Sequence, residues 1–142
     1  MPDRTAFLSH YPFGGLLTWT AHALAAPAAV YGPRAGAALE LLALGGIWVA
    51  FVLAAWLVAQ RRWTLPELIA ILFALFVSWI GYQDIWASAY GIGRTLSPLL
   101  IAMAWIALRD RRPVFALPLL MIVPRIALQF AAEIKVVLGA GL

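Results

Sequence analysis

An all-α, membrane-embedded bundle of four to five helices is the fold class that the sequence predicts. The apolar fraction is 65% and the charged fraction is 11%, against roughly 45 to 50% and 25% in soluble domains. Mean hydropathy is +0.94, and long apolar runs recur along the 142 residues. Because a helix needs about 20 residues to cross the bilayer, a chain of this length supplies a handful of crossings. We expect one transmembrane domain over residues 1–142.

The first two apolar segments differ in strength. Residues 13–30 contain two threonines, His22 and Pro27, so this segment either spans the bilayer or lies in the interface as an amphipathic helix. Residues 35–59 are longer and almost free of charge, and residues 60–63 (QRRW) close them with two arginines and an interfacial tryptophan. The second segment is therefore expected to span.

Three further helices are predicted after this turn. Residues 64–67 (TLPE) are typical of a helix start, with threonine as the N-cap and proline in the first turn. A third helix is accordingly expected over 65–80. A fourth is expected over 87–108 and a fifth over 113–138, with the basic turn 109–112 between them.

The basic turns predict the orientation. Residues 61–62 and 109–112 carry the strongest basic clusters and are separated by two predicted spans, so they fall on the same side of the membrane. The positive-inside rule makes that side cytoplasmic. We therefore expect an integral protein of the bacterial cytoplasmic (inner) membrane.

Composition argues against several function classes. With no cysteine there is no thiolate chemistry, and two histidines are too few for a zinc or haem site without carboxylate help. No Walker loop, metal-ligand cluster or nucleophile elbow is present in the sequence. The basic residues form short clusters between apolar runs, which is unlike a nucleic-acid-binding face. We expect no metal, no cofactor and no nucleic acid, and the sequence leaves open whether the chain is an enzyme.

Two arginines lie deep inside predicted spans. Arg125 is twelve residues from Pro113, or about 18 Å along a helix, and Arg94 is fifteen residues from Arg109, or about 22 Å. Because the short basic turn makes the fourth and fifth helices antiparallel neighbours, both guanidiniums are expected at similar depth in the outer half of the membrane. A charge at such depth costs at least about 2.5 to 3.5 kcal/mol. A negative group is therefore expected nearby.

Three interpretations of these arginines stay open. Internal pairs of Arg94 with Asp84 and of Arg125 with Glu40 would fasten the bundle. A phosphate or carboxylate of a lipid or ligand would suit the planar guanidinium, which makes Arg94 and Arg125 a candidate anion site. Alternatively, the side chains snorkel to the membrane surface.

Aromatic residues supply one more candidate. Most of the seven tryptophans are expected to pack or to lie at the membrane interfaces. Trp86 and Tyr90, close to Asp84, are the candidate pair for stacking on a sugar or a headgroup. Ordinary packing is the competing interpretation.

The chain also resembles a known group of membrane proteins. It is similar to the C-terminal membrane region of bacterial polytopic glycosyltransferases that use polyprenyl-phosphate sugars for cell-surface glycans. The matching pieces are residues 11–15 (YPFGG), 63–67 (WTLPE), 90–99 (YGIGRTLSPL) and Pro124-Arg125.

The resemblance implies that Arg94 and Arg125 face a lipid phosphate, and that the partners are membrane lipids including a polyprenyl phosphate. Enzymes of this group have more spans and an early catalytic acidic residue that has no counterpart here, so the resemblance implies a fragment, a split subunit or a degenerate relative. A non-catalytic accessory subunit of a respiratory, photosynthetic or transport membrane complex is the alternative that the residues support.

Overall fold

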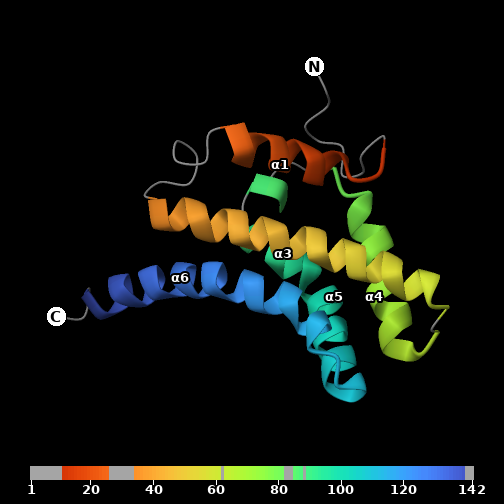
Figure 1. The fold of residues 1–142 in the computed structure, drawn as a ribbon. Helices are drawn as coiled ribbons and strands as arrows, with labels where there is room; N and C mark the ends of the chain where they lie inside the picture. Colours follow the sequence, from red (N-terminus) through yellow and green to blue (C-terminus); the bar gives the residue numbers. More distant parts are fainter. Residues whose placement is uncertain (1–10, 26–33, 62, 82–84, 88, 140–142) are drawn as a thin grey trace.

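The computed structural model describes residues 11–25, 34–61, 63–81, 85–87 and 89–139, and it is built from helices (Figure 1). The predicted all-helical fold is confirmed for these ranges, which contain no sheet. The elements are α1 (Gly14–Ala25), α3 (Arg34–Ala59), α4 (Leu65–Ser78), η1 (Ile85–Ala87), α5 (Ala89–Asp110), η2 (Pro113–Ala116) and α6 (Leu117–Gly139).

The predicted boundaries lie within two residues of the observed ones for the three central helices. α3 and α4 begin and end almost as expected, and α5 is shifted by two residues toward the C-terminus. The expected fifth helix begins as the short 3-10 helix η2 at Pro113 before α6 continues. The doubtful segment 13–30 contains α1, whose described 12 residues give about 18 Å, too short for about 30 Å of hydrocarbon. Residues 26–30 lie outside the described ranges.

Two described helices are long and apolar enough to cross a membrane. They are Gly36–Ala59, with 24 residues, and Gly91–Asp110, with 20 residues. Leu65–Ser78 and Pro113–Leu128 are apolar but shorter. Of the four to five membrane helices that the sequence predicts, two described helices are thus long and apolar enough to span, and the other crossings stay a prediction.

α3 is the central element of the bundle. Figure 1 shows α1 lying along one side of it and α6 running antiparallel to it on the other, while α4 and α5 cross its C-terminal half as an antiparallel pair. The most extensive packing joins α3 to α6 and α4 to α5. The core between them is apolar, with side chains such as Ile47, Leu57, Leu99 and Met103 buried.

Close approach of α3 and α6 depends on a glycine. A Cβ placed on Gly46 would lie 2.8 Å from Cβ of Met121 and 3.1 Å from the carbonyl oxygen of Pro118. Such distances leave no room for a side chain, so the two backbones touch here. This contact sets the rotation and the separation of the two helices that carry the candidate site.

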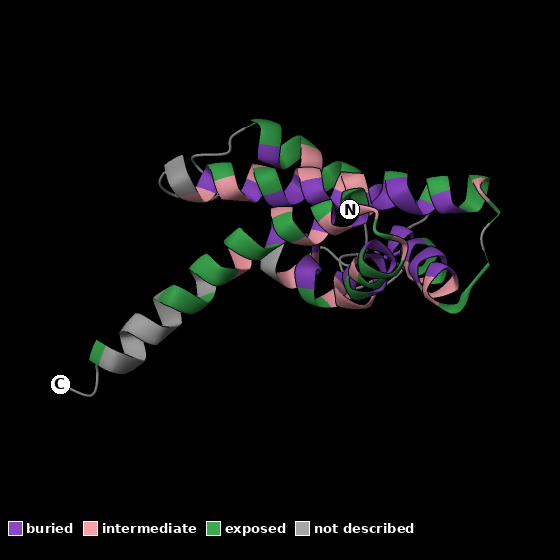
Figure 2. Ribbon diagram, turned by 60° about the horizontal axis from the view of Figure 1, so that its bottom comes forward, coloured by how far each residue is buried: buried purple, intermediate pink, exposed green. Residues whose placement is uncertain are grey.

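The second half of α6 leaves the bundle. Ile122 is buried, but every described side chain from Ala127 onward is exposed, including Leu128 and Phe130. Figure 2 shows this part of α6 extending away from the other helices. The described side chains of this segment therefore leave much of their surface uncovered by the bundle.

Candidate functional site

Arg125 of α6 and Glu40 of α3 form an ion pair inside the bundle. Nε of Arg125 donates a hydrogen bond of 2.6 Å to Oε2 of Glu40. The Glu40 side chain is 0% exposed and that of Arg125 is 16% exposed. Internal pairing, one of the three interpretations left open by the sequence, is thus what the structure shows for this arginine.

The Arg125 guanidinium is only partly used by this pair. A guanidinium offers five N–H donors, and the contact to Glu40 engages Nε alone. Within the described residues, its two terminal nitrogens make no hydrogen bond or ion pair. These nitrogens are the groups that water or an anionic oxygen could reach through the partly exposed side of the residue.

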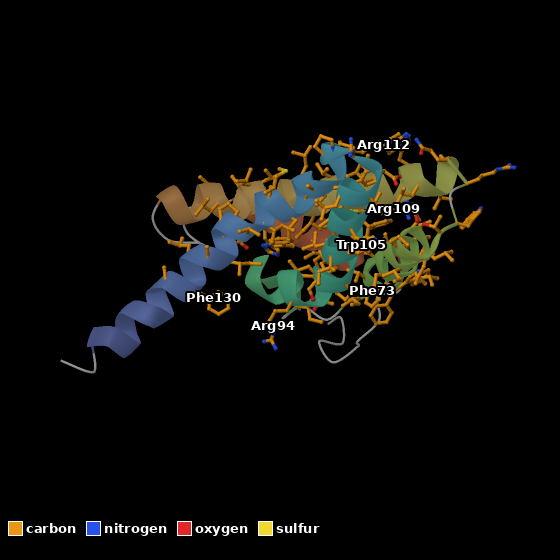
Figure 3. All side chains as sticks on the ribbon, turned by 90° about the horizontal axis from the view of Figure 1, so that it is seen from below. Phe73, Arg94, Trp105, Arg109, Arg112 and Phe130 are labelled. Carbon is orange, nitrogen blue, oxygen red and sulfur yellow. The ribbon has the colours of Figure 1, made fainter. Side chains whose placement is uncertain are left out.

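Arg94 lies at the same level as Arg125 but is oriented differently. A Cβ on Gly93 of α5 would lie 3.2 Å from Cδ1 of Ile126 in α6, which places the two arginines beside the same helix contact. Arg94 is exposed, and Figure 3 shows its side chain pointing away from the bundle. Arg94 and Arg125 lie at the same level along the helices, as expected from the sequence. The side chain of Arg94 points outward, however, and is separate from the Arg125–Glu40 pair. Asp84, its candidate partner, lies outside the described residues.

Trp86 has a structural role in the fold. It is 4% exposed, and its Nε1 donates a hydrogen bond of 2.8 Å to the carbonyl oxygen of Ile80. Its indole tilts against Trp19 at 6.4 Å between centroids and lies directly over Gly15, which has no side chain to obstruct it. Of the candidate pair for stacking on a sugar or a headgroup, Trp86 is therefore covered by α1, and the side chain of Tyr90 lies outside the described set.

A second charged cluster, which the sequence analysis did not identify, joins α4 to α5. Glu67 is 0% exposed and forms an ion pair with Nη2 of Arg109. Nη1 of Arg109 also donates 2.7 Å to Oγ1 of Thr64, and Nε donates 2.8 Å to Oδ1 of Asp110. The hydroxyl of Thr64 donates to Glu67. Thr64 occupies the expected N-cap position, but its hydroxyl caps no backbone N–H.

The signal for this cluster was present in the chain. Glu67 follows one basic turn and Arg109 is the first residue of the next, so a hairpin of α4 and α5 brings both to the same end. Depth matching by residue counting was applied only to the charges expected in the outer half of the membrane; applied to Glu67 and Arg109, it would have placed these two residues at the same level. The contact between Glu67 and Arg109 was missed because Glu67 was interpreted as part of a helix start and Arg109 as part of a basic turn that indicates the orientation.

The geometry of both charged clusters joins one helix to another. Both buried carboxylates, Glu40 and Glu67, face an arginine from another helix, and each such pair offsets part of the cost of burying its charges. Among the described residues, no group of three or more histidine, cysteine or acidic side chains is placed to hold a metal ion. The arrangement can hold helices together and can present guanidinium nitrogens to an anion.

Comparison with known proteins places no further constraint on the chain. No family model, no curated protein and no solved structure matches it. The similarity to polytopic glycosyltransferases consequently stays a prediction that rests on short sequence pieces, and no family is assigned.

Proposed function

We propose that the chain is a helical membrane protein that serves as a non-catalytic subunit of a larger membrane assembly. The observation that carries the proposal is the second half of α6, which continues beyond the bundle to Gly139 with Leu128 and Phe130 exposed (Figure 2). The buried carboxylates add support, because each is neutralised within the chain and holds two helices together.

The composition of this segment favours a protein partner over lipid alone. Residues 129–139 (QFAAEIKVVLG) mix apolar residues with Gln129, Glu133 and Lys135. Polar and charged residues are costly in hydrocarbon and are stabilised by neighbouring helices. A helix of another subunit beside α6 supplies both the apolar contact and the polar partners.

Site-specific photo-crosslinking in the native membrane tests the proposal. A photoreactive phenylalanine analogue replaces Leu128 or Phe130, and the matched control carries it at Leu72, which is 62% exposed on α4. We expect a discrete protein adduct from the two α6 positions, and a native complex containing the same protein in fixed stoichiometry. Lipid adducts alone from all three positions, with the chain migrating by itself, would refute the proposal.

A second candidate function, binding of a lipid-linked phosphate as part of a sugar-transfer or glycan-assembly system, is favoured by one observation. The terminal nitrogens of Arg125 make no hydrogen bond among the described residues, and exposed Arg94 lies at the same level of the helix pair. Arginine suits phosphate because its planar fork binds two oxygens at once.

Binding of undecaprenyl phosphate to the purified protein tests this second candidate. Arg94→Gln and Arg125→Lys are the variants, since the lysine keeps the charge near Glu40 while removing the bidentate fork. If the second candidate function is right, both variants should bind undecaprenyl phosphate more weakly than the wild type does. Equal binding in all three proteins would remove it and leave the subunit proposal in place.

A further inference from the structure

Two arginines adopt a backbone conformation that is ordinarily left to glycine. Arg61, just after α3, has φ 51°, and Arg111, just after α5, has φ 54°. Helices commonly end in this left-handed conformation, but the residue there is usually glycine because a Cβ is disfavoured. The backbone N–H of Arg112 donates 3.0 Å to the carbonyl oxygen of Ala107, the hydrogen bond that typically closes a helix around such a residue.

A third residue with a left-handed backbone, Phe13, makes contacts that offset the strain of that conformation. Phe13 has φ 64°, and its N–H donates 2.6 Å to the carbonyl oxygen of Ser78. Its ring packs on Phe51 at 5.1 Å between centroids and on Trp48 at 6.4 Å. Packing thus accounts for a large side chain at that position.

Arg61 and Arg111 have no comparable compensation inside the protein. Both side chains are exposed, and within the described residues neither guanidinium takes part in an ion pair, a hydrogen bond or a ring contact. The strain of each backbone is therefore not offset by a visible side-chain contact. An outlier of this kind points to an interaction with something outside the chain.

Both arginines belong to one end of the bundle. Arg109, two residues before Arg111, contacts Thr64 at the start of α4, and the guanidinium of Arg112 lies 5.7 Å from the ring centroid of Trp56 in α3. The neighbourhood of Arg109 and Arg112 at this end is visible in Figure 3. The ends of α3 and α5 and the start of α4 therefore meet there.

Amphipathic and apolar residues surround the charges at this end. Trp63 is 56% exposed and Leu108 is 78% exposed, so an indole and an aliphatic side chain stand beside the guanidiniums. Tryptophan at the level of the headgroups and arginine reaching toward phosphate are the usual occupants of a membrane interface. We call Arg61, Arg111, Arg112, Trp56 and Trp63 together the basic end.

We infer that the basic end binds the phosphate groups of anionic phospholipids, with Arg61 and Arg111 as the contacting residues. The inference rests on the proposed membrane function, and the predicted cytoplasmic side of this end matches the leaflet whose anionic lipids attract basic residues. It concerns a surface separate from Arg94, which is seventeen residues from Arg111, or about 25 Å along α5.

A structural explanation competes with this inference. A positive side chain near a helix C-terminus interacts favourably with the helix dipole, so the arginines would then serve the helices themselves. Glycine separates the two explanations, because it removes the guanidinium and at the same time relieves the left-handed backbone. Lysine retains the charge and the Cβ.

The experiment compares the wild type, Arg61→Gly/Arg111→Gly and Arg61→Lys/Arg111→Lys in a neutral detergent. Native mass spectrometry counts bound phosphatidylglycerol against phosphatidylcholine of the same chain length, and thermal unfolding follows the fold. Since each basic residue near an anionic surface contributes about 1 kcal/mol, the preference for phosphatidylglycerol should fall about fivefold per arginine in the glycine variant. The lysine variant should keep most of the preference, and the glycine variant should unfold at or above the wild-type temperature.

Three results would overturn the inference: an unchanged lipid preference in the glycine variant, a lower unfolding temperature of that variant, or loss of bound phosphatidylglycerol on adding inorganic phosphate. The last result would show a site for free phosphate in place of a lipid surface. Extraction of the wild type from membranes by alkaline carbonate would overturn this inference and the proposed function together. An integral wild type with an unchanged lipid preference in the glycine variant removes this inference alone.

Discussion

Replacement of Arg125 by leucine should cost the protein several kcal/mol of stability. The change leaves the carboxylate of Glu40, which is 0% exposed, without the guanidinium that lies 2.6 Å from it. Removing one partner of a buried ion pair costs about 3 to 5 kcal/mol, because the remaining charge stays out of water without that counter-ion. Domains are stable by only about 5 to 15 kcal/mol in total, so the loss should be large and measurable.

A double-mutant cycle assigns this loss to the pair. Arg125→Leu/Glu40→Leu removes both charges and replaces them with apolar side chains, which is often neutral or stabilising in a buried setting. We expect the double variant to recover most of the loss caused by Arg125→Leu alone. The coupling energy then measures the pair itself.

Thermal or denaturant unfolding in neutral detergent, followed by circular dichroism, supplies the free energies. Arg94→Leu is the matched control: it makes the same chemical change at the same level of α5 and α6, on an exposed side chain, and should cost under about 1 kcal/mol. A cost below about 1 kcal/mol for Arg125→Leu, or a double variant as unstable as the single one, would refute the reasoning.

Further predictions concern the helix contacts. Gly46→Ala should lower the unfolding free energy by about 1 to 3 kcal/mol, because the added Cβ would lie 2.8 Å from Cβ of Met121; Gly45→Ala, whose Cβ would meet only a flexible methyl at 3.2 Å, is the milder control in the same unfolding assay. Arg109→Leu should cost about 3 to 5 kcal/mol, since it leaves Glu67 buried without its cation; an unfolding midpoint equal to that of the wild type would contradict this expectation. Gly15→Ala should displace the indole that would lie 2.1 Å from the new Cβ, detected as a changed tryptophan emission spectrum, and an unchanged spectrum would argue against the described packing of α1.

Helix positions were accessible from the sequence because they depend on local features. Apolar length, the threonine–proline start of α4 and the basic residues at the helix ends act within a few residues of chain. Observed α3 and α4 follow them closely. The ends of the fifth helix also follow them, but its first turn is the 3-10 helix η2, and α1 is described only over Gly14–Ala25 of the predicted 13–30.

The candidate site was accessible in part. A rise of about 1.5 Å per residue converts sequence separation into depth, which is why the shared level of Arg94 and Arg125 and the candidacy of Glu40 as a partner came from residue counting. Depth carries no information about rotation around the helix axis. Residue counting could therefore not predict that Arg94 points outward or that Trp86 is buried beneath α1.

The amino-acid sequence by itself determined that this chain folds as helices rich in apolar residues, where most of them begin and end, and which charges share a level. Only the tertiary structure decided that Arg125 turns toward Glu40 and that Arg109 reaches Glu67. It also decided that the second half of α6 leaves the bundle. The physical reason is that local propensity acts along the chain, whereas the rotation and crossing of helices are set by close contacts such as that of Gly46 with α6.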